Sequence, residues 1–172
     1  MHHLSPGRIH TSRLTLEPVS PEHATGMASA LSDPELYAFI GGEPPSRDDL
    51  EDRYRRLESA LSPDRTEGWL NWAIRATDDG QLAGYVQATV RERSGVLEAD
   101  VAWVIGKDWQ GRRYATEAAD AMAAWLQARG VGRLSAWIRP GHAASEAVAR
   151  RLHMIPTSEM ADGEMRWVLD SG

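Results

Sequence analysis

The residues with the clearest chemical potential lie in segment 109–118, which reads Trp-Gln-Gly-Arg-Arg-Tyr-Ala-Thr-Glu-Ala. Alternating hydrophobic residues predict a strand before it, and a period of 3.6 residues predicts a helix that begins inside it. The first N–H groups of a helix lack partners within the helix and carry the positive end of its dipole, so they favour an anion. Arg112 and Arg113 add positive charge at the same point. The segment therefore predicts a site for a phosphate or pyrophosphate.

Several other kinds of chemistry find no support in the sequence. The patterns G-x-x-x-x-G-K-S/T and G-x-G-x-x-G are absent, which argues against a P-loop and a dinucleotide fingerprint. No G-x-S-x-G is present, so a serine hydrolase is not indicated. The absence of cysteine excludes disulfides, thiolate metal sites and a cysteine nucleophile. His2, His3 and His10 follow no ligand pattern, and we expect no metal.

Composition and length indicate one soluble globular unit. The chain has 172 residues, of which 42% are hydrophobic and 26% charged, enough for one continuous core. The net charge of −6 argues against non-specific binding to nucleic acid. The first residues lack a signal-peptide core, and no apolar run approaches the ~20 residues of a membrane span. We expect a single domain over residues 1–172, flexible over 1–12, cytoplasmic, monomeric or homodimeric, and without nucleic-acid or membrane partners.

The elements that must position segment 109–118 follow from hydrophobic periodicity. Alternation predicts strands over residues 13–19, 70–75, 82–93, 96–105 and 134–138, and two more over 154–169. Helical spacing predicts helices over 20–31, 46–61, 115–126 and 140–152, and turn signals at 78–80 and 94–95 indicate an antiparallel meander. The order predicts an α+β fold with a mixed, largely antiparallel sheet of about six to seven strands and about four helices.

Segment 109–118 resembles the acyl-CoA motif Q/R-x-x-G-x-G/A of the GNAT N-acetyltransferases. It is especially similar to the branch that acetylates ribosomal-protein N-termini, where W-Q/R-G-K/R-G-Y-A-T-E-A is typical. Residues 82–85 resemble the family's third strand, and residues 140–152 resemble its last helix. The predicted order of elements matches that of the family from residue 13 to residue 169. The resemblance implies a GNAT-like acyl-CoA N-acyltransferase fold and transfer of an acetyl group from acetyl-CoA to a primary amine.

Arg113 departs from the motif, which has glycine at this position. Glycine lets the backbone approach the phosphates, and a side chain is tolerated if the local φ is negative. Because residues at a helix start normally have negative φ, we expect Arg113 to be accommodated, with its guanidinium on phosphate or in solvent. The alternative is weakened cofactor binding, and with it a non-catalytic acyl-CoA-binding module of the same fold.

The resemblance also implies which residues contact acetyl-CoA. The backbone of the strand that ends at Ile105 would pair with the pantetheine arm, and an N–H near Val104 would polarise the thioester carbonyl. His142 replaces a family asparagine. The cofactor-binding residues implied are Trp103, Val104, Ile105, Gln110, Gly111, Arg112, Arg113, Tyr114, Ala115, Thr116, His142 and Ser145.

Three residues are candidates for proton transfer on the same resemblance. Asp100 occupies the position where the family branch has an acid, and Glu98 lies two residues earlier on the same strand face. Either would act as the base for the amine, directly or through water, or would be a solvated edge charge. Ser145 matches a family serine near the sulfur and would contact CoA or protonate the thiolate. Its alternative is a bond to the helix backbone.

The acceptor remains open at the level of sequence. Tyr37, Phe39 and Glu43 lie in the loop that borders the acceptor in the family, and the alternative for them is hydrophobic anchoring of that loop. The resemblance allows a protein N-terminus, a polyamine, an amino acid or an antibiotic as the amine, because acceptor choice depends on loops.

Overall fold

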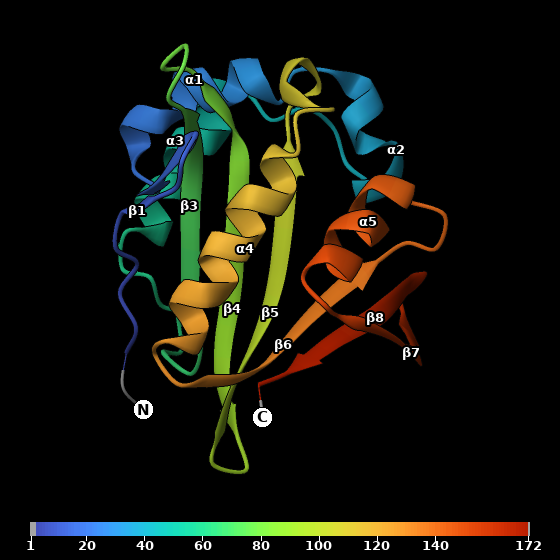
Figure 1. Cartoon of the computed structure of the whole chain (residues 1–172). Helices are drawn as coiled ribbons and strands as arrows, with labels where there is room; N and C mark the ends of the chain where they lie inside the picture. The colour runs from blue at the N-terminus through green and yellow to red at the C-terminus, as the bar shows by residue number, and fades with distance from the viewer. Residues whose placement is uncertain (1–2, 172) are drawn as a thin grey trace.

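The computed structural model describes residues 3–171 and shows one sheet with helices on both faces (Figure 1). Its eight strands follow the order β1-β2-β3-β4-β5-β6-β8-β7. The pairing of β5 with β6 is parallel, and the other neighbouring pairs are antiparallel. The strands are β1 Ile9–His10, β2 Leu14–Pro18, β3 Gly68–Ala76, β4 Leu82–Arg93, β5 Val96–Ile105, β6 Val131–Ile138, β7 Ile155–Ala161 and β8 Glu164–Asp170.

Five α-helices accompany the sheet within the same residues: α1 Ala24–Ala30, α2 Tyr37–Ile40, α3 Arg47–Leu57, α4 Tyr114–Gln127 and α5 Ala143–Arg151. Short 3-10 helices precede α1, α2 and α4, at Pro21–His23, Pro34–Leu36 and Lys107–Trp109. In Figure 1, α4 and α5 lie in front of the sheet and α1 and α3 behind it. No helix in this part of the chain has the length and apolar character to cross a membrane.

The α+β class and the order of elements are confirmed, with two additions. Strand β1 pairs with β2, Ile9 opposite Leu16, and adds an edge to the sheet. Of segment 1–12, for which the sequence predicts flexibility, residues 1–2 lie outside the described residues. The loop before α3 contains the four-residue helix α2. A two-residue strand and a one-turn helix are too short for hydrophobic periodicity to reveal.

Strand alternation divides the core between the two faces of the sheet. Trp72 and Val86 are fully buried in the larger cluster, beneath the fully buried Met122 of α4. Ala73 and Val104 point the other way and join the smaller cluster with α1 and α3. The two clusters hold the sheet between helices, so the central strands provide a rigid base for the site.

Candidate active site

Strands β5 and β6 separate halfway along their length. Their paired residues run from Leu97 opposite Val131 to Asp100 opposite Ser135, although β5 continues to Ile105. Figure 1 shows the two strands diverging toward the end at which α4 begins. The ladder between β4 and β5 continues as far as Ile105, so only one edge of β5 opens into the gap. A free strand edge offers N–H and C=O groups that pair with an extended ligand.

The backbone groups that face this gap can be assigned from the ladder between β4 and β5. The N–H of Gly106 donates to the carbonyl of Ala83 at 2.8 Å, which directs Gly106 toward β4. Successive residues of a strand alternate between its two edges. Val104 therefore also faces β4, whereas Trp103 and Ile105 face the gap.

Close packing at Gly84 agrees with this assignment. Gly84 has a φ of +154°, and a Cβ there would lie 2.0 Å from the carbonyl oxygen of Val104. The Val104 carbonyl therefore points at β4, and only glycine fits beneath it. On the gap side, the carbonyl of Ile105 accepts a hydrogen bond from Gln110 Nε2 at 3.0 Å. Gln110 thus ties the start of the turn to the end of β5.

The turn into α4 contains two residues with positive φ. Gly111 has a φ of +80°, and Arg113, the N-cap residue of α4, has a φ of +62° in the left-handed region. The expectation of a negative φ at Arg113 was wrong. The left-handed conformation costs a non-glycine residue roughly 1–2 kcal/mol, which gives the glycine of the family motif a physical reason. Arg113 adopts the conformation in spite of that cost.

The start of α4 keeps its positive character. Arg113 forms no side-chain cap, so the first N–H groups of this 14-residue helix remain open. Glu117, the acid in the first turn, accepts hydrogen bonds from Thr11 Oγ1 at 2.6 Å and Arg13 Nε at 2.8 Å. Burial raises the pKa of Glu117, but these hydrogen bonds outweigh it and the pKa is lowered. Because Glu117 is paired with Arg13, it does not neutralise Arg112 and Arg113, which are exposed and can contact an anionic ligand.

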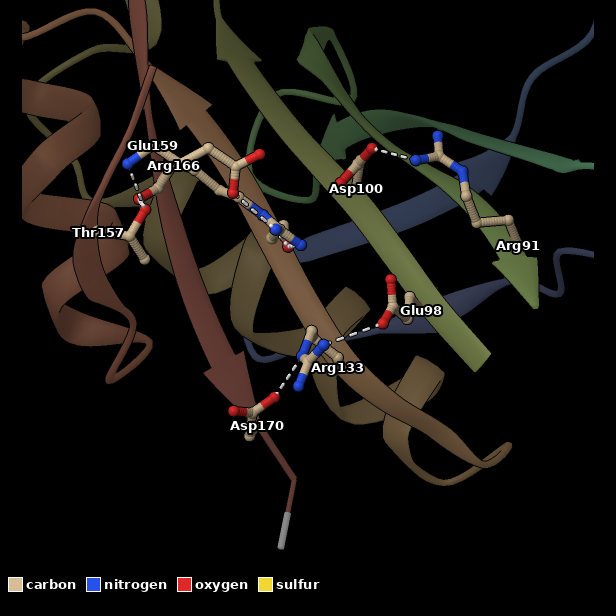
Figure 2. Close-up of polar contacts among 9 residues, drawn as sticks. Arg91, Glu98, Asp100, Arg133, Thr157, Glu159, Arg166 and Asp170 are labelled. Atoms are coloured by element: carbon tan, nitrogen blue, oxygen red, sulfur yellow. Dashed lines mark hydrogen bonds and ion pairs between the residues drawn. The ribbon is translucent and has the colours of Figure 1, made fainter. Parts of the chain in front are cut away.

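The two candidate carboxylates have different positions relative to the gap, and both are ion-paired (Figure 2). Asp100 lies at the last paired position of β5 and β6 and accepts a hydrogen bond from Arg91 Nη1 at 2.9 Å. Glu98 lies two residues further into the paired region and accepts one from Arg133 Nη1 at 3.1 Å. The side chain of Asp100 is 31% exposed and that of Glu98 15%. Asp100 is therefore the acid at the mouth of the gap.

The start of α5 meets the acceptor loop at the opposite side of the gap. The rings of Phe39 and His142 stack with centroids 4.4 Å apart and an interplanar angle of 9°. His142 Nε2 lies 3.5 Å from Ser145 Oγ. Burial lowers the pKa of His142, although the nearby Glu146 carboxylate opposes the shift. The structure thus brings together a residue predicted for the acceptor side and two predicted for the cofactor.

A cavity of about 290 Å³ lies between α2, α3 and the sheet. Tyr37 and Glu43 line it as predicted residues, whereas Phe39 instead stacks on His142. The hydroxyl of Tyr37 donates to the Leu31 carbonyl at 2.9 Å. Sequence reasoning missed the other polar lining residues, which are Arg53, Tyr54, Asn71, Tyr85 and Gln87.

One sequence signal pointed to two of these missed residues, Tyr85 and Gln87. Tyr85, Gln87 and Thr89 alternate with small and apolar residues along β4, so they place polar groups on the face that α1 and α3 cover. Burial raises the pKa of Tyr54 and of Tyr85, and both phenols stay neutral and able to donate a hydrogen bond. Among residues 3–171, no group of three His, Asp or Glu side chains is arranged to hold a metal ion.

Fold and site together define an α+β protein with a split central sheet and an uncapped, positively charged helix start beside the split. Residues 13–155 match the family model described as an acetyltransferase (GNAT) domain. The chain therefore belongs to the GNAT acetyltransferase family, as the motif at 109–118 predicted. No curated protein gives a significant match to the sequence.

Solved structures with the same fold span nearly the whole chain. RimL, the ribosomal L7/L12 alpha-N-protein acetyltransferase solved with coenzyme A, has a TM-score of 0.78 at 17% identity, covering 95% of this chain and 98% of that one. The ribosomal-protein-S5-alanine acetyltransferase of Vibrio fischeri has a TM-score of 0.79 at 12% identity, covering 96% and 97%. A GNAT-family acetyltransferase of Bacillus anthracis has a TM-score of 0.76 at 16% identity, covering 95% and 98%. At these identities the likeness extends to the fold alone.

Proposed function

We propose that this acetyltransferase moves the acetyl group of acetyl-CoA directly to a primary amine, which approaches on the α1 and α3 face of the sheet. The observation that carries the proposal is the one-sided opening of β5 beyond Asp100. It supplies a free strand edge for an extended pantetheine arm, next to a positively charged helix start for the pyrophosphate. The presence of coenzyme A in the RimL structure supports this donor.

The donor side of the reaction uses backbone groups. The N–H groups of Trp103 and Ile105 face the gap, and one of them would polarise the thioester carbonyl and hold the oxyanion of the tetrahedral intermediate. Such a donor contributes about 10²–10³-fold to the rate. The pyrophosphate would lie against the backbone of Gly111 and the first N–H groups of α4, with Arg112 and Arg113 beside it.

The proton of the attacking amine is assigned to Asp100. The neutral amine attacks the thioester carbon, and the nitrogen, which becomes positively charged as the C–N bond forms, loses a proton to Asp100 Oδ1, directly or through one water, because Arg91 holds Oδ2. Glu98 is engaged by Arg133 deeper in the paired region, and we give it a structural role. This assignment makes Asp100 the base and keeps Arg91 as its positioning partner.

Collapse of the intermediate breaks the C–S bond and releases the CoA thiolate. Ser145 Oγ, beside His142, is the proton donor that we assign to this sulfur. His142 lies between Ser145 and the ring of Phe39, so the stack would hold the imidazole against the serine. Ser145 regains a proton from solvent and Asp100 releases one to it, so that the net reaction exchanges the acetyl group and one proton between CoA and the amine.

A protein N-terminus is the acceptor that we favour. Two of the structural relatives are named as acetyltransferases of ribosomal proteins. The cavity between α2, α3 and the sheet lies on the face from which the amine would approach. Polyamines, amino acids and antibiotics are the alternative acceptors against which a protein N-terminus is to be compared.

The test measures thiol release from acetyl-CoA with a panel of these amines, together with calorimetric binding of CoA. Wild-type protein should bind CoA and release thiol only with an amine, and Asp100→Asn should keep CoA binding while losing turnover. Glu98→Gln is the matched control because it also breaks an arginine pair on β5. The competing function is a non-catalytic acyl-CoA-binding module, which the strained Arg113 favours. CoA binding without turnover on any amine would establish that module.

A further inference from the structure

A second, larger cavity lies beside the first on the acceptor face. Its volume is about 750 Å³, and it lies between the end of α3, the loop that follows α3, and strands β3 and β4. Both cavities are lined by Arg53, Leu57, Asn71 and Gln87, so they adjoin. The larger cavity extends along β4 to Thr89, the residue paired with Asp100. One end of the cavity therefore lies near Asp100, the base that we assign to the acceptor amine.

The charge of this cavity is entirely positive. Its charged lining residues are Arg53, Arg56 and Arg65, with no acid among them. None of the three has a carboxylate within ion-pair distance in residues 3–171. By contrast, Arg47 and Arg55 on the same helix are both paired with Glu51. In a chain with a net charge of −6, three unpaired arginines around one cavity run against the overall charge.

The two acids closest to Arg65 in the sequence, Asp64 and Glu67, are engaged by other groups. Glu67 accepts hydrogen bonds from Trp69 Nε1 at 3.0 Å and Arg91 Nε at 3.2 Å. Asp64 accepts from the hydroxyls of Ser62 and Thr66, and these bonds lower its pKa. Neither acid lines the cavity, so its arginines remain open to an anion from outside.

We propose that the arginine-lined cavity binds carboxylates of the acceptor, and that the acceptor is a peptide N-terminus followed by acidic residues. This deepens the proposed function and rests on it, because the amine must lie at Asp100. The cavity reaches Thr89, which pairs with Asp100, so residues that follow an N-terminus at Asp100 would lie beside its arginines. Arginine suits the role because its planar fork binds a carboxylate through two parallel hydrogen bonds. The same charge repels a polyamine.

The experiment compares peptides that share one N-terminal residue and carry Asp, Asn or Lys at positions two to five. Acetylation of the acidic peptide should have a kcat/KM at least about tenfold above that of the Asn peptide and still further above that of the Lys peptide. The preference should fall as ionic strength rises, because salt screens exposed charges. Equal kcat/KM for all three peptides would overturn the inference.

Charge reversal tests the cavity itself. The double variant Arg56→Glu and Arg65→Glu should invert the preference toward the Lys peptide, measured as the ratio of kcat/KM for the Lys peptide to that for the Asp peptide. Arg55→Gln is the control for Arg56→Gln, since it lies on the same helix outside the cavity. If Arg55→Gln and Arg56→Gln change the kcat/KM of the acidic peptide equally, the preference comes from general surface charge, and the proposal that the cavity binds the peptide is wrong.

Two further measurements separate this inference from the proposed function. Fluorescence anisotropy of the labelled acidic peptide reports its binding without turnover, so loss of binding in the double variant supports the cavity even if no amine is acetylated. Turnover of neutral amines with no acidic preference would leave the proposed function standing and refute the inference. Free aspartate as acceptor is the last arm: acetylation as efficient as that of the acidic peptide would contradict a peptide substrate.

Discussion

The donor and acceptor sites that we propose on the two faces of the central sheet consist of different kinds of groups. On the donor side, the gap between β5 and β6 offers backbone N–H and C=O groups, and the turn into α4 offers a helix start. On the acceptor side, two adjoining cavities are lined by side chains from α2, α3, β3 and β4. A backbone site needs a certain chain path, whereas a side-chain site needs certain residues. The backbone part of the proposed donor site therefore lies in one short segment, whereas the residues of the proposed acceptor site are dispersed along the chain.

Positive charge also serves the two faces differently. Arg112 and Arg113 are adjacent in sequence and flank a helix start, which already favours an anion. Arg56 and Arg65 come from a helix and a separate loop, and only folding brings them to one cavity. The comparison predicts that changes on the donor side disturb the backbone and stability, whereas changes on the acceptor side alter substrate preference.

The largest expected effect is that of Gly84→Ala, which tests whether the backbone path defines the donor side. The new Cβ would lie 2.0 Å from the Val104 carbonyl, at a φ of +154°. We expect a loss of about 3 kcal/mol in the free energy of unfolding, from overpacking and backbone strain together. Urea denaturation measures it. Gly80→Ala is the control, because position 80 has a φ of +70° and open space. A similar, small loss at both positions would contradict the packing argument.

The variant Asp100→Asn tests whether Asp100 is the base that takes the proton from the acceptor amine. We expect kcat to fall by roughly 10²-fold or more, because the amine loses its base, while calorimetry shows unchanged CoA affinity. Thermal denaturation of the variant checks that loss of the Arg91 ion pair has not unfolded the sheet. If Glu98→Gln lowers kcat as much as Asp100→Asn does, the assignment of the base to the mouth of the gap is wrong.

The variant Arg113→Gly tests whether the turn before α4 contributes to CoA binding through its left-handed backbone or through the side chain of Arg113. Relief of the left-handed strain should raise the free energy of unfolding by about 1 kcal/mol, less the entropy that glycine adds to the unfolded chain. Affinity for CoA should be unchanged or higher. Arg112→Gly is the comparison, since no positive φ occurs at position 112. A large loss of CoA affinity in Arg113→Gly alone would mean that the guanidinium, and not the backbone, holds the phosphate.

The smallest expected effect concerns His142, where the two faces touch through the stack with Phe39. Burial lowers the pKa of His142 in the folded state, so the unfolded chain binds the proton more readily. The stability that this neutral imidazole contributes is present above its ordinary pKa of about 6.5 and is lost as the pH falls. Thermal denaturation between pH 7.5 and 5.5 should therefore show a smaller drop in Tm for His142→Asn than for the unchanged chain. Equal drops would show that the stack does not exclude water from the ring.

Much of the fold was predictable because its signals are local. Alternation and turn residues predicted the meander from β3 to β5, and the helical period predicted α4 and α5. Segment 109–118 predicted a turn into a helix start, which the structure contains, and binding of an anion there stays a prediction. The φ of Arg113 was missed because a residue at a helix start is ordinarily right-handed. Here Arg113 is the N-cap residue of α4 and lies in the left-handed region.

The sequence by itself determined the longer strands and helices and the charged turn before α4, because each depends on neighbours within a few residues. Only the tertiary structure decided how far β5 and β6 pair, which arginine meets Asp100, and that Phe39 lies on His142. It also decided that unpaired arginines from α3 and its following loop surround one cavity. These features depend on contacts between residues far apart in the chain, and such contacts are set by the packing of the whole sheet and its helices.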